Sequence, residues 1–229
     1  MLPAEGNILL LAGDIVPFIV MEKHTDFFNY IADNFECTYW VPGNHEYYYS
    51  DVADKCGAVH EKIRPNVFLV NNQTIKLDGV RLIFSTLWSK ISPIKEWTIQ
   101  QSIADFEVIQ FSGERFSPHH FNLLHQEALG FLSAALTEKK QDKTIVITHH
   151  VPTLMNYPPL YKNNPLNEAF AVELHDFIGD AGADYWIYGH HHSRVQPFEI
   201  GKTKLITNQL GYVKYKEHIG FEGRSYIEV

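Results

Sequence analysis

Acidic, amide and imidazole side chains recur in this sequence directly after short apolar or β-forming runs. They belong to Asp14, to Asn44 with His45, to His149, and to His190 with His192. Oxygen and imidazole donors of this kind are the ligands that Zn, Mn and Fe ions take in proteins. Loops at strand ends are also where rigid scaffolds hold reactive groups. The pattern therefore predicts a metal centre.

Each segment also has an ordinary structural explanation when it is taken alone. Gly13-Asp14 and Gly43-Asn44 are common turn pairs, and His149-His150 could be core or surface histidines. The Gly189-His190-His191-His192 segment is more specific, because alternate residues of an extended chain point to the same side. His190 and His192 can therefore grip one metal cluster. It is the joint occurrence of the segments that favours a shared site.

Apolar periodicity and turn signals predict the elements that would position these side chains. Asp78-Gly79 between two β-forming runs is a strong hairpin signal, and Ser117-Pro118 is typical of a helix start. We expect strands over residues 8–11, 38–41, 67–70, 73–77, 80–85, 144–148, 185–188, 195–198, 204–207 and 225–229. We expect helices over residues 24–35, 51–64, 96–104, 118–136 and 168–178.

The order of these elements is mixed α and β at first and rich in strands later. This order predicts an α/β (α+β) fold, a layered β-sandwich of mixed sheets flanked by helices. No internal repeat, low-complexity segment or linker divides the chain, so we expect one domain over residues 1–229.

Composition narrows the classes of function. The formal net charge of −8 disfavours general nucleic-acid binding, which usually needs a basic face. Cys37 and Cys56 form no CxxC pair and are too few for a disulfide framework, which favours a reducing cytoplasm. No apolar run approaches the roughly 20 residues of a membrane helix. We therefore expect a cytoplasmic protein without a membrane partner.

The calcineurin-like metallophosphoesterases have signatures that resemble four segments of this chain, in the same order. The segments are Gly13-Asp14, Gly43-Asn44-His45-Glu46, Val146-Ile147-Thr148-His149 and Gly189-His190-His191-His192. The resemblance spans nearly the whole chain, and each motif follows a predicted strand. It implies hydrolysis of a small phosphomonoester or phosphodiester by metal-activated hydroxide. Residues 86–88 and 208–212 also look like elements of bacterial members, predicted phosphohydrolases of unassigned substrate.

The resemblance also implies a role for each metal ligand. Asp14 would bridge two divalent ions, with Asn44, His149 and His190 completing one site and His192 contributing to the other. Two ions about 3.5 to 4 Å apart can clamp phosphoryl oxygens and generate hydroxide from bound water. Manganese, iron and zinc all suit this ligand set.

Other residues would act without binding metal. Asp14 and His45 would be the catalytic residues, His45 by steadying a phosphoryl oxygen or protonating the leaving group. Glu46 would orient His45. We expect His150 to support the site and His191 not to be a ligand. We expect a surface position for three histidines of the long helix, His119, His120 and His125.

One departure from the family pattern bears on activity. Family members normally begin with a strand that ends in Asp-x-His, and no such motif precedes Asp14. The expected fold therefore lacks its first strand. Three explanations are open. The start of the chain is misassigned and the chain is impaired; or the chain holds a single metal through Asp14, Asn44, His149 and His190; or it is a non-catalytic scaffold. The open edge predicts either a monomer or a dimer that pairs through the vacated position.

Two other functions compete with phosphoester hydrolysis. One is a non-catalytic metal-binding or protein-interaction scaffold of the same fold. The other is a mononuclear hydrolase of amide or ester bonds, which the absence of an HExxH motif disfavours. The loops over residues 88–116 and 151–167 have no signature that would identify a substrate.

Overall fold

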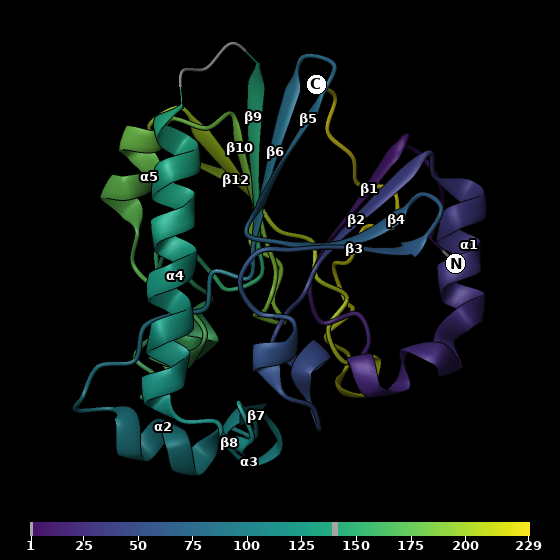
Figure 1. The fold of residues 1–229 in the computed structure, drawn as a ribbon. Coiled ribbons are helices and arrows are strands. Elements are labelled where there is room, and N and C mark those ends of the chain that lie inside the picture. The colour runs from purple at the N-terminus through teal and green to yellow at the C-terminus, as the bar shows by residue number, and fades with distance from the viewer. Residues whose placement is uncertain (1, 139–141) are drawn as a thin grey trace.

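Two mixed β-sheets pack face to face between helices in the computed structural model, which describes residues 2–138 and 142–229 (Figure 1). The space between the sheets is filled by apolar side chains from both. They include Tyr39, Val41 and Val70 from one sheet and Phe84 and Ile147 from the other. The expected α/β sandwich with helices outside is therefore confirmed.

The first sheet has the strand order β1-β2-β4-β3. β1 (Ile8–Ala12), β2 (Cys37–Val41) and β4 (Val67–Asn71) are parallel, and β3 (Val59–Arg64) is antiparallel to β4. A 3-10 helix (Phe18–His24) and α1 (Thr25–Asn34) connect β1 to β2. Phe28 and Ile31 of α1 are buried in one cluster with Trp40 of β2, so α1 covers the outer face of this sheet.

The second sheet has the order β11-β12-β10-β9-β6-β5. Its strands are β5 (Gln73–Leu77), β6 (Val80–Ser85), β9 (Lys143–Thr148), β10 (Tyr185–Tyr188), β11 (Phe198–Ile200) and β12 (Thr203–Ile206). The four central strands are parallel, and both edge strands are antiparallel to their neighbours. α4 (Pro118–Thr137) and α5 (His175–Ala181) cover its outer face, where Leu132 and Ile178 pack with Trp186.

An aromatic cluster below the sheets holds a group of short elements. These are α2 (Glu96–Ser102), α3 (Asp105–Val108), β7 (Gln110–Phe111) and β8 (Glu114–Arg115). Trp88, Phe106, Phe116 and Phe121 are buried against one another and against Tyr47, from the segment that follows β2. Residues 88–116, for which the sequence indicated little, are thus packed against the segment that follows β2 and against the first turns of α4 (Figure 1).

Four predictions about secondary structure are wrong. The strand expected over residues 195–198 is displaced, because β11 begins only at Phe198. No helix forms over residues 51–64, because residues 59–64 pair with β4 and only a 3-10 turn (Val52–Asp54) is present. Strand pairing here overrides the local helical spacing. Residues 225–229 form no strand, although Ile227 packs against the core between the sheets. The helix expected over residues 168–178 is confined to a 3-10 turn (Asn167–Ala169) and to α5.

No helix in residues 2–138 and 142–229 combines the length and apolar character needed to cross a lipid bilayer.

Candidate metal centre

Four strands deliver polar residues to one region of the molecule. Asp14 follows β1, Asn44 follows β2, His149 follows β9 and His190 follows β10. Ligand sites of open α/β sheets form at the carboxyl ends of parallel strands. The two sheets meet there, because Nδ1 of His149 lies 2.8 Å from the carbonyl oxygen of Ala12 at the end of β1.

Nε2 of His149 is the atom around which the other candidate ligands gather. It lies 2.9 Å from Nδ1 of His190, 3.2 Å from Oδ1 of Asn44 and 3.4 Å from Oδ1 of Asp14. Asp14, His149 and His190 have ligand atoms that are all within 4.8 Å of one another. Ligands about 2.0 to 2.2 Å from a cation lie about 2.8 to 3.6 Å from each other at ordinary coordination angles. The spacing fits a single bound ion.

The protonation of His149 supports the same conclusion. The Ala12 carbonyl can only accept, so Nδ1 of His149 donates to it and Nε2 of the neutral ring carries a lone pair. Burial lowers the pKa of His149. Burial also lowers the pKa of His190 well below its usual value, and the neighbouring histidines add to this. Neutral imidazoles are the form that binds metal, so the donor set suits a divalent cation.

Glu46 holds the loop that carries Asp14. Its fully buried carboxylate accepts the backbone N–H groups of Asp14 (2.8 Å), Ile15 and Val16 (3.1 Å), and also that of Gly43. Burial raises the pKa of Glu46 to about 8, the charge of Asp14 adds to this, and the backbone donors oppose it. These hydrogen bonds go to the backbone of residues 14–16 and of Gly43, and not to His45, which Glu46 is expected to orient. They join the β1 loop to the β2 loop.

Two glycines make room for the ring of His149. A Cβ atom at Gly43 would come within 2.5 Å of Cε1 of His149, and one at Gly13 within 2.7 Å of Cγ. Gly13 also has a φ of +87°, which glycine adopts without strain. Any larger residue at either position would displace the imidazole.

Two of the candidate ligands have left-handed backbone conformations. The φ angle is +58° at Asp14 and +70° at His190. Such angles are unfavourable for residues other than glycine and cluster at functional sites. Both residues turn the chain sharply at the end of a strand, which directs their side chains into the site.

The rim of the site is aromatic. His45 is half-buried, and its ring stacks on that of Tyr48 with centroids 4.3 Å apart. Tyr212, from the C-terminal segment, has its ring centroid 6.4 Å from that of His45 and 4.6 Å from that of His192. The backbone N–H of His45 donates to Oδ1 of Asp14. His45 is therefore beside the metal ligands without belonging to their group.

His192 lies apart from the group formed by Asp14, His149 and His190. Its Nδ1 atom pairs with Oε2 of Glu217 at 2.8 Å. A carboxylate on one ring nitrogen often orients the other nitrogen toward a metal. The expected metal role of His192 stays a prediction.

The remaining histidines are placed as follows. His150 is fully buried, and its ring centroid lies 4.3 Å from that of His190; its supporting role stays a prediction. His191 contacts Nε2 of Gln209 through Nδ1 and does not belong to the group formed by Asp14, His149 and His190. His119 is exposed, whereas His120 is half-buried and stacks on Phe111.

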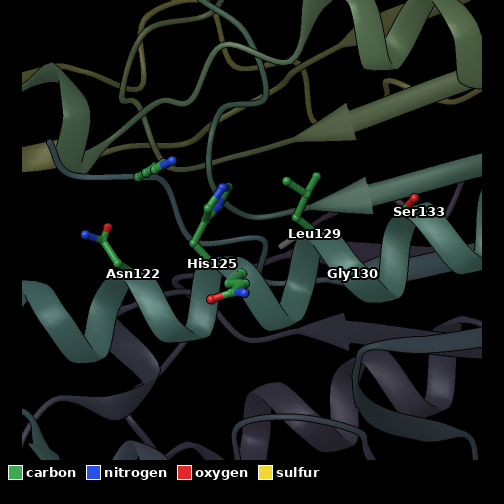
Figure 2. A pocket seen from close by; sticks show the side chains of 7 residues that line it. Asn122, His125, Leu129, Gly130 and Ser133 are labelled. Carbon is green, nitrogen blue, oxygen red and sulfur yellow. The ribbon is translucent and has the colours of Figure 1, made fainter.

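The surface position expected for His125 is wrong. Its side chain is buried, because the inner face of α4 turns it toward the Trp88 carbonyl, 2.9 Å from Nδ1. It lines a groove of about 580 Å³ along α4 (Figure 2). The groove is bordered by Lys90, Asn122, His125, Gln126, Leu129, Gly130 and Ser133. No candidate ligand lines it.

Sequence reasoning missed Asp105 and Tyr48. The Asp105 carboxylate accepts hydrogen bonds from Nδ2 of Asn44 and from the Tyr48 hydroxyl. Burial raises the pKa of Asp105, and those two hydrogen bonds oppose the rise. Asp105 lies in a stretch without a readable motif and 61 positions from Asn44, so no local signal indicates the contact.

Comparison with known proteins adds independent observations. A family model described as calcineurin-like phosphoesterase matches residues 2–194. An uncharacterized protein of Acanthamoeba polyphaga mimivirus is 32% identical over 246 aligned positions, covering 99% of this chain and 85% of that protein. The crystal structure of phosphopantetheinyl hydrolase from Mycobacterium tuberculosis has a similar fold, with a TM-score of 0.65 and 14% identity. That match covers 90% of this chain and 80% of the other.

Proposed function

The chain belongs to the calcineurin-like phosphoesterase family, and from this we propose that it hydrolyses a small phosphate ester at a metal held by Asp14, Asn44, His149 and His190. The observation that carries the proposal is the convergence of three other ligand atoms on Nε2 of His149 at 2.9 to 3.4 Å. Lone pairs from separate strands are brought together where a cation would offset their repulsion.

A divalent cation bound there would polarise a phosphoryl oxygen and lower the pKa of a water molecule. The chain's own residues would bind the cation and assist the leaving group. Asp14 offers a carboxylate whose other contact is the backbone N–H of His45, which keeps its orientation. His45 is the half-buried imidazole next to the ligands and would stabilise a phosphoryl oxygen or give a proton to the leaving group.

We propose one well-held ion per chain. The ligand atoms of Asp14, His149 and His190 lie close enough together to share one ion, and His192 lies outside that group. The ion pair between His192 and Glu217 would then keep the imidazole oriented at the rim, next to Tyr212. The same proposal includes manganese, iron or zinc as the metal and a single domain in the cytoplasm. The chain would be either a monomer or a dimer that pairs through the edge of β1.

Metal analysis combined with hydrolysis tests this function. The protein is purified without chelator, its metal content is measured, and p-nitrophenyl phosphate and bis(p-nitrophenyl) phosphate are offered with and without Mn²⁺. We expect near-stoichiometric metal and hydrolysis that chelation abolishes and Mn²⁺ restores. His149→Ala should lose the metal, whereas His45→Ala should keep it and lose hydrolysis. His119→Ala, at an exposed position on α4, is the control.

The outcomes separate the proposed enzyme from a binding scaffold. Metal uptake without hydrolysis of either ester would support the scaffold. Hydrolysis that survives both His149→Ala and chelation would contradict a metal centre at this position.

A further inference from the structure

Asp105 is a buried carboxylate whose position is fixed by its neighbours in the chain. It is the first residue of α3, and its side chain is 3% exposed. Phe106, the next residue, is fully buried and stacks on Phe116 with ring centroids 5.7 Å apart. The backbone N–H of Tyr49 donates to the Val108 carbonyl, which joins α3 to the segment after β2. The carboxylate therefore has little freedom to move.

Both oxygens of this carboxylate are occupied by contacts with the segment after β2. Nδ2 of Asn44 lies 2.9 Å from Oδ1 and 3.0 Å from Oδ2, and the Tyr48 hydroxyl donates to Oδ1 at 2.9 Å. An ionised carboxylate only accepts hydrogen bonds, so it requires donors at these positions. Asp105 is also outside the group of candidate metal ligands. The contacts of Asp105 therefore hold the side chain of Asn44 in place.

The orientation of the Asn44 amide decides whether this residue can bind a cation. The oxygen and nitrogen of an amide are almost equal in shape, and a half-turn exchanges them. Only the oxygen has lone pairs to offer. Because Nδ2 faces Asp105, Oδ1 faces Nε2 of His149 at 3.2 Å. The opposite orientation would turn an NH₂ group toward the metal position.

The same carboxylate reaches His45 through one further side chain. Tyr48 donates its hydroxyl to Asp105, and its ring stacks on His45 with an interplanar angle of 23°. Removing the hydroxyl would leave the ring but release its anchor. A single buried group thus contacts the candidate metal ligand Asn44 directly and the candidate proton donor His45 through Tyr48.

We propose that Asp105 is a positioning residue that holds the Asn44 amide with its oxygen toward the metal and, through Tyr48, restrains the ring of His45. The proposal rests on the metal site described above and is independent of the substrate. Groups behind metal ligands commonly change affinity by about 10 to 100-fold when they are replaced.

The affinity for Mn²⁺, measured by competition with a chelating dye, tests the first half. Asp105→Asn should weaken it by about 10 to 100-fold. An amide at position 105 can accept and donate, so the Asn44 amide is no longer held in one orientation. Glu107→Gln, an exposed neutralisation in the same helix, should leave the affinity unchanged. Wild-type affinity in Asp105→Asn would overturn the positioning role.

A charge exchange distinguishes orientation from general destabilisation. In the double variant Asn44→Asp with Asp105→Asn, the ligand becomes a carboxylate with two equivalent oxygens, and the amide at position 105 can donate to one of them. We expect Mn²⁺ affinity close to wild type, with the d–d bands of the Co²⁺-substituted protein also restored. Affinity of the double variant about 10-fold or more below that of the wild type would overturn the proposal, whether or not the single variant folds.

Tyr48→Phe tests the second half. It keeps the ring against His45 and removes the hydroxyl, so kcat for the aryl phosphate should fall while Mn²⁺ affinity changes little. An unchanged kcat would show that the contact through Tyr48 has no role. Failure of the wild-type chain to bind Mn²⁺ would overturn the proposed function itself, which separates it from a failure of the Asp105 variants alone.

Discussion

The carboxylate of Glu46 accepts the backbone N–H of Asp14 at 2.8 Å, although the two residues are 32 positions apart. The same side chain binds the N–H of Val16 and of Gly43. Glu46 therefore holds Asp14 by its backbone, while the Asp14 carboxylate faces the site and accepts the backbone N–H of His45.

Replacing Glu46 by glutamine should damage both the fold and the metal site. The amide places an NH₂ group against backbone donors, and buried groups left without a partner cost about 1 to 3 kcal/mol each. We expect the free energy of unfolding in urea to fall by about 2 kcal/mol or more, together with weaker Mn²⁺ binding. Glu199→Gln, on the exposed side of β11, is the matched control. Equal stability of the two variants would contradict the role of Glu46.

An alanine at Gly43 should displace His149. Its Cβ atom would lie 2.5 Å from Cε1 of that ring, and a buried overpacking of this kind costs about 1 to 3 kcal/mol. Loss of bound metal and a lower melting temperature are the expected results. Gly130→Ala serves as the control, because nothing lies within 4 Å of its Cβ position on α4. That change should stabilise the chain by up to about 1 kcal/mol.

Acid should destabilise the chain through His125. Burial lowers the pKa of this residue below its ordinary value of 6.5, so the unfolded chain binds the proton more readily. The stability contributed by the neutral ring is present above about pH 6.5 and is lost as the pH falls below it. Urea unfolding of the metal-free protein should therefore require less denaturant at about pH 5.5 than at about pH 7.5. His125→Asn, which can still donate to the Trp88 carbonyl, should reduce this difference; a pH dependence that is the same in both proteins would exclude His125 as a source.

The segment over residues 208–222 should loosen when Arg194 is replaced. Arg194 donates to the Gly220 carbonyl and to Glu222, and most of the segment is exposed rather than packed into the core. In Arg194→Gln, backbone hydrogen exchange across this segment should become faster, while the midpoint of global unfolding changes little because exposed ion pairs add little stability. Unchanged exchange would show that the other contacts of the segment, including those of His192 and Gln209, hold it without Arg194.

Strand ends and the motifs that follow them were predictable, because they depend on local properties. Apolar runs next to glycine-containing turns identified the strands before Asp14, Asn44, His149 and His190. Where local pattern and pairing disagreed, as in β3, the pattern misled, since the helical spacing of residues 51–64 competed with a neighbouring strand that is visible only in three dimensions.

The metal-binding chemistry of the site could be predicted from the types and order of its residues. Oxygen and imidazole donors that follow successive parallel strands must gather at one end of a sheet. The hydrogen bonds that set the geometry of the site could not be predicted. Glu46 reaches back to the β1 loop, and Asp105 meets Asn44 across 61 positions, through contacts between side chains that are distant in the chain. Such contacts exist only once both sheets and the aromatic cluster around Phe106 have packed, which is why the supporting residues emerge from the folded molecule.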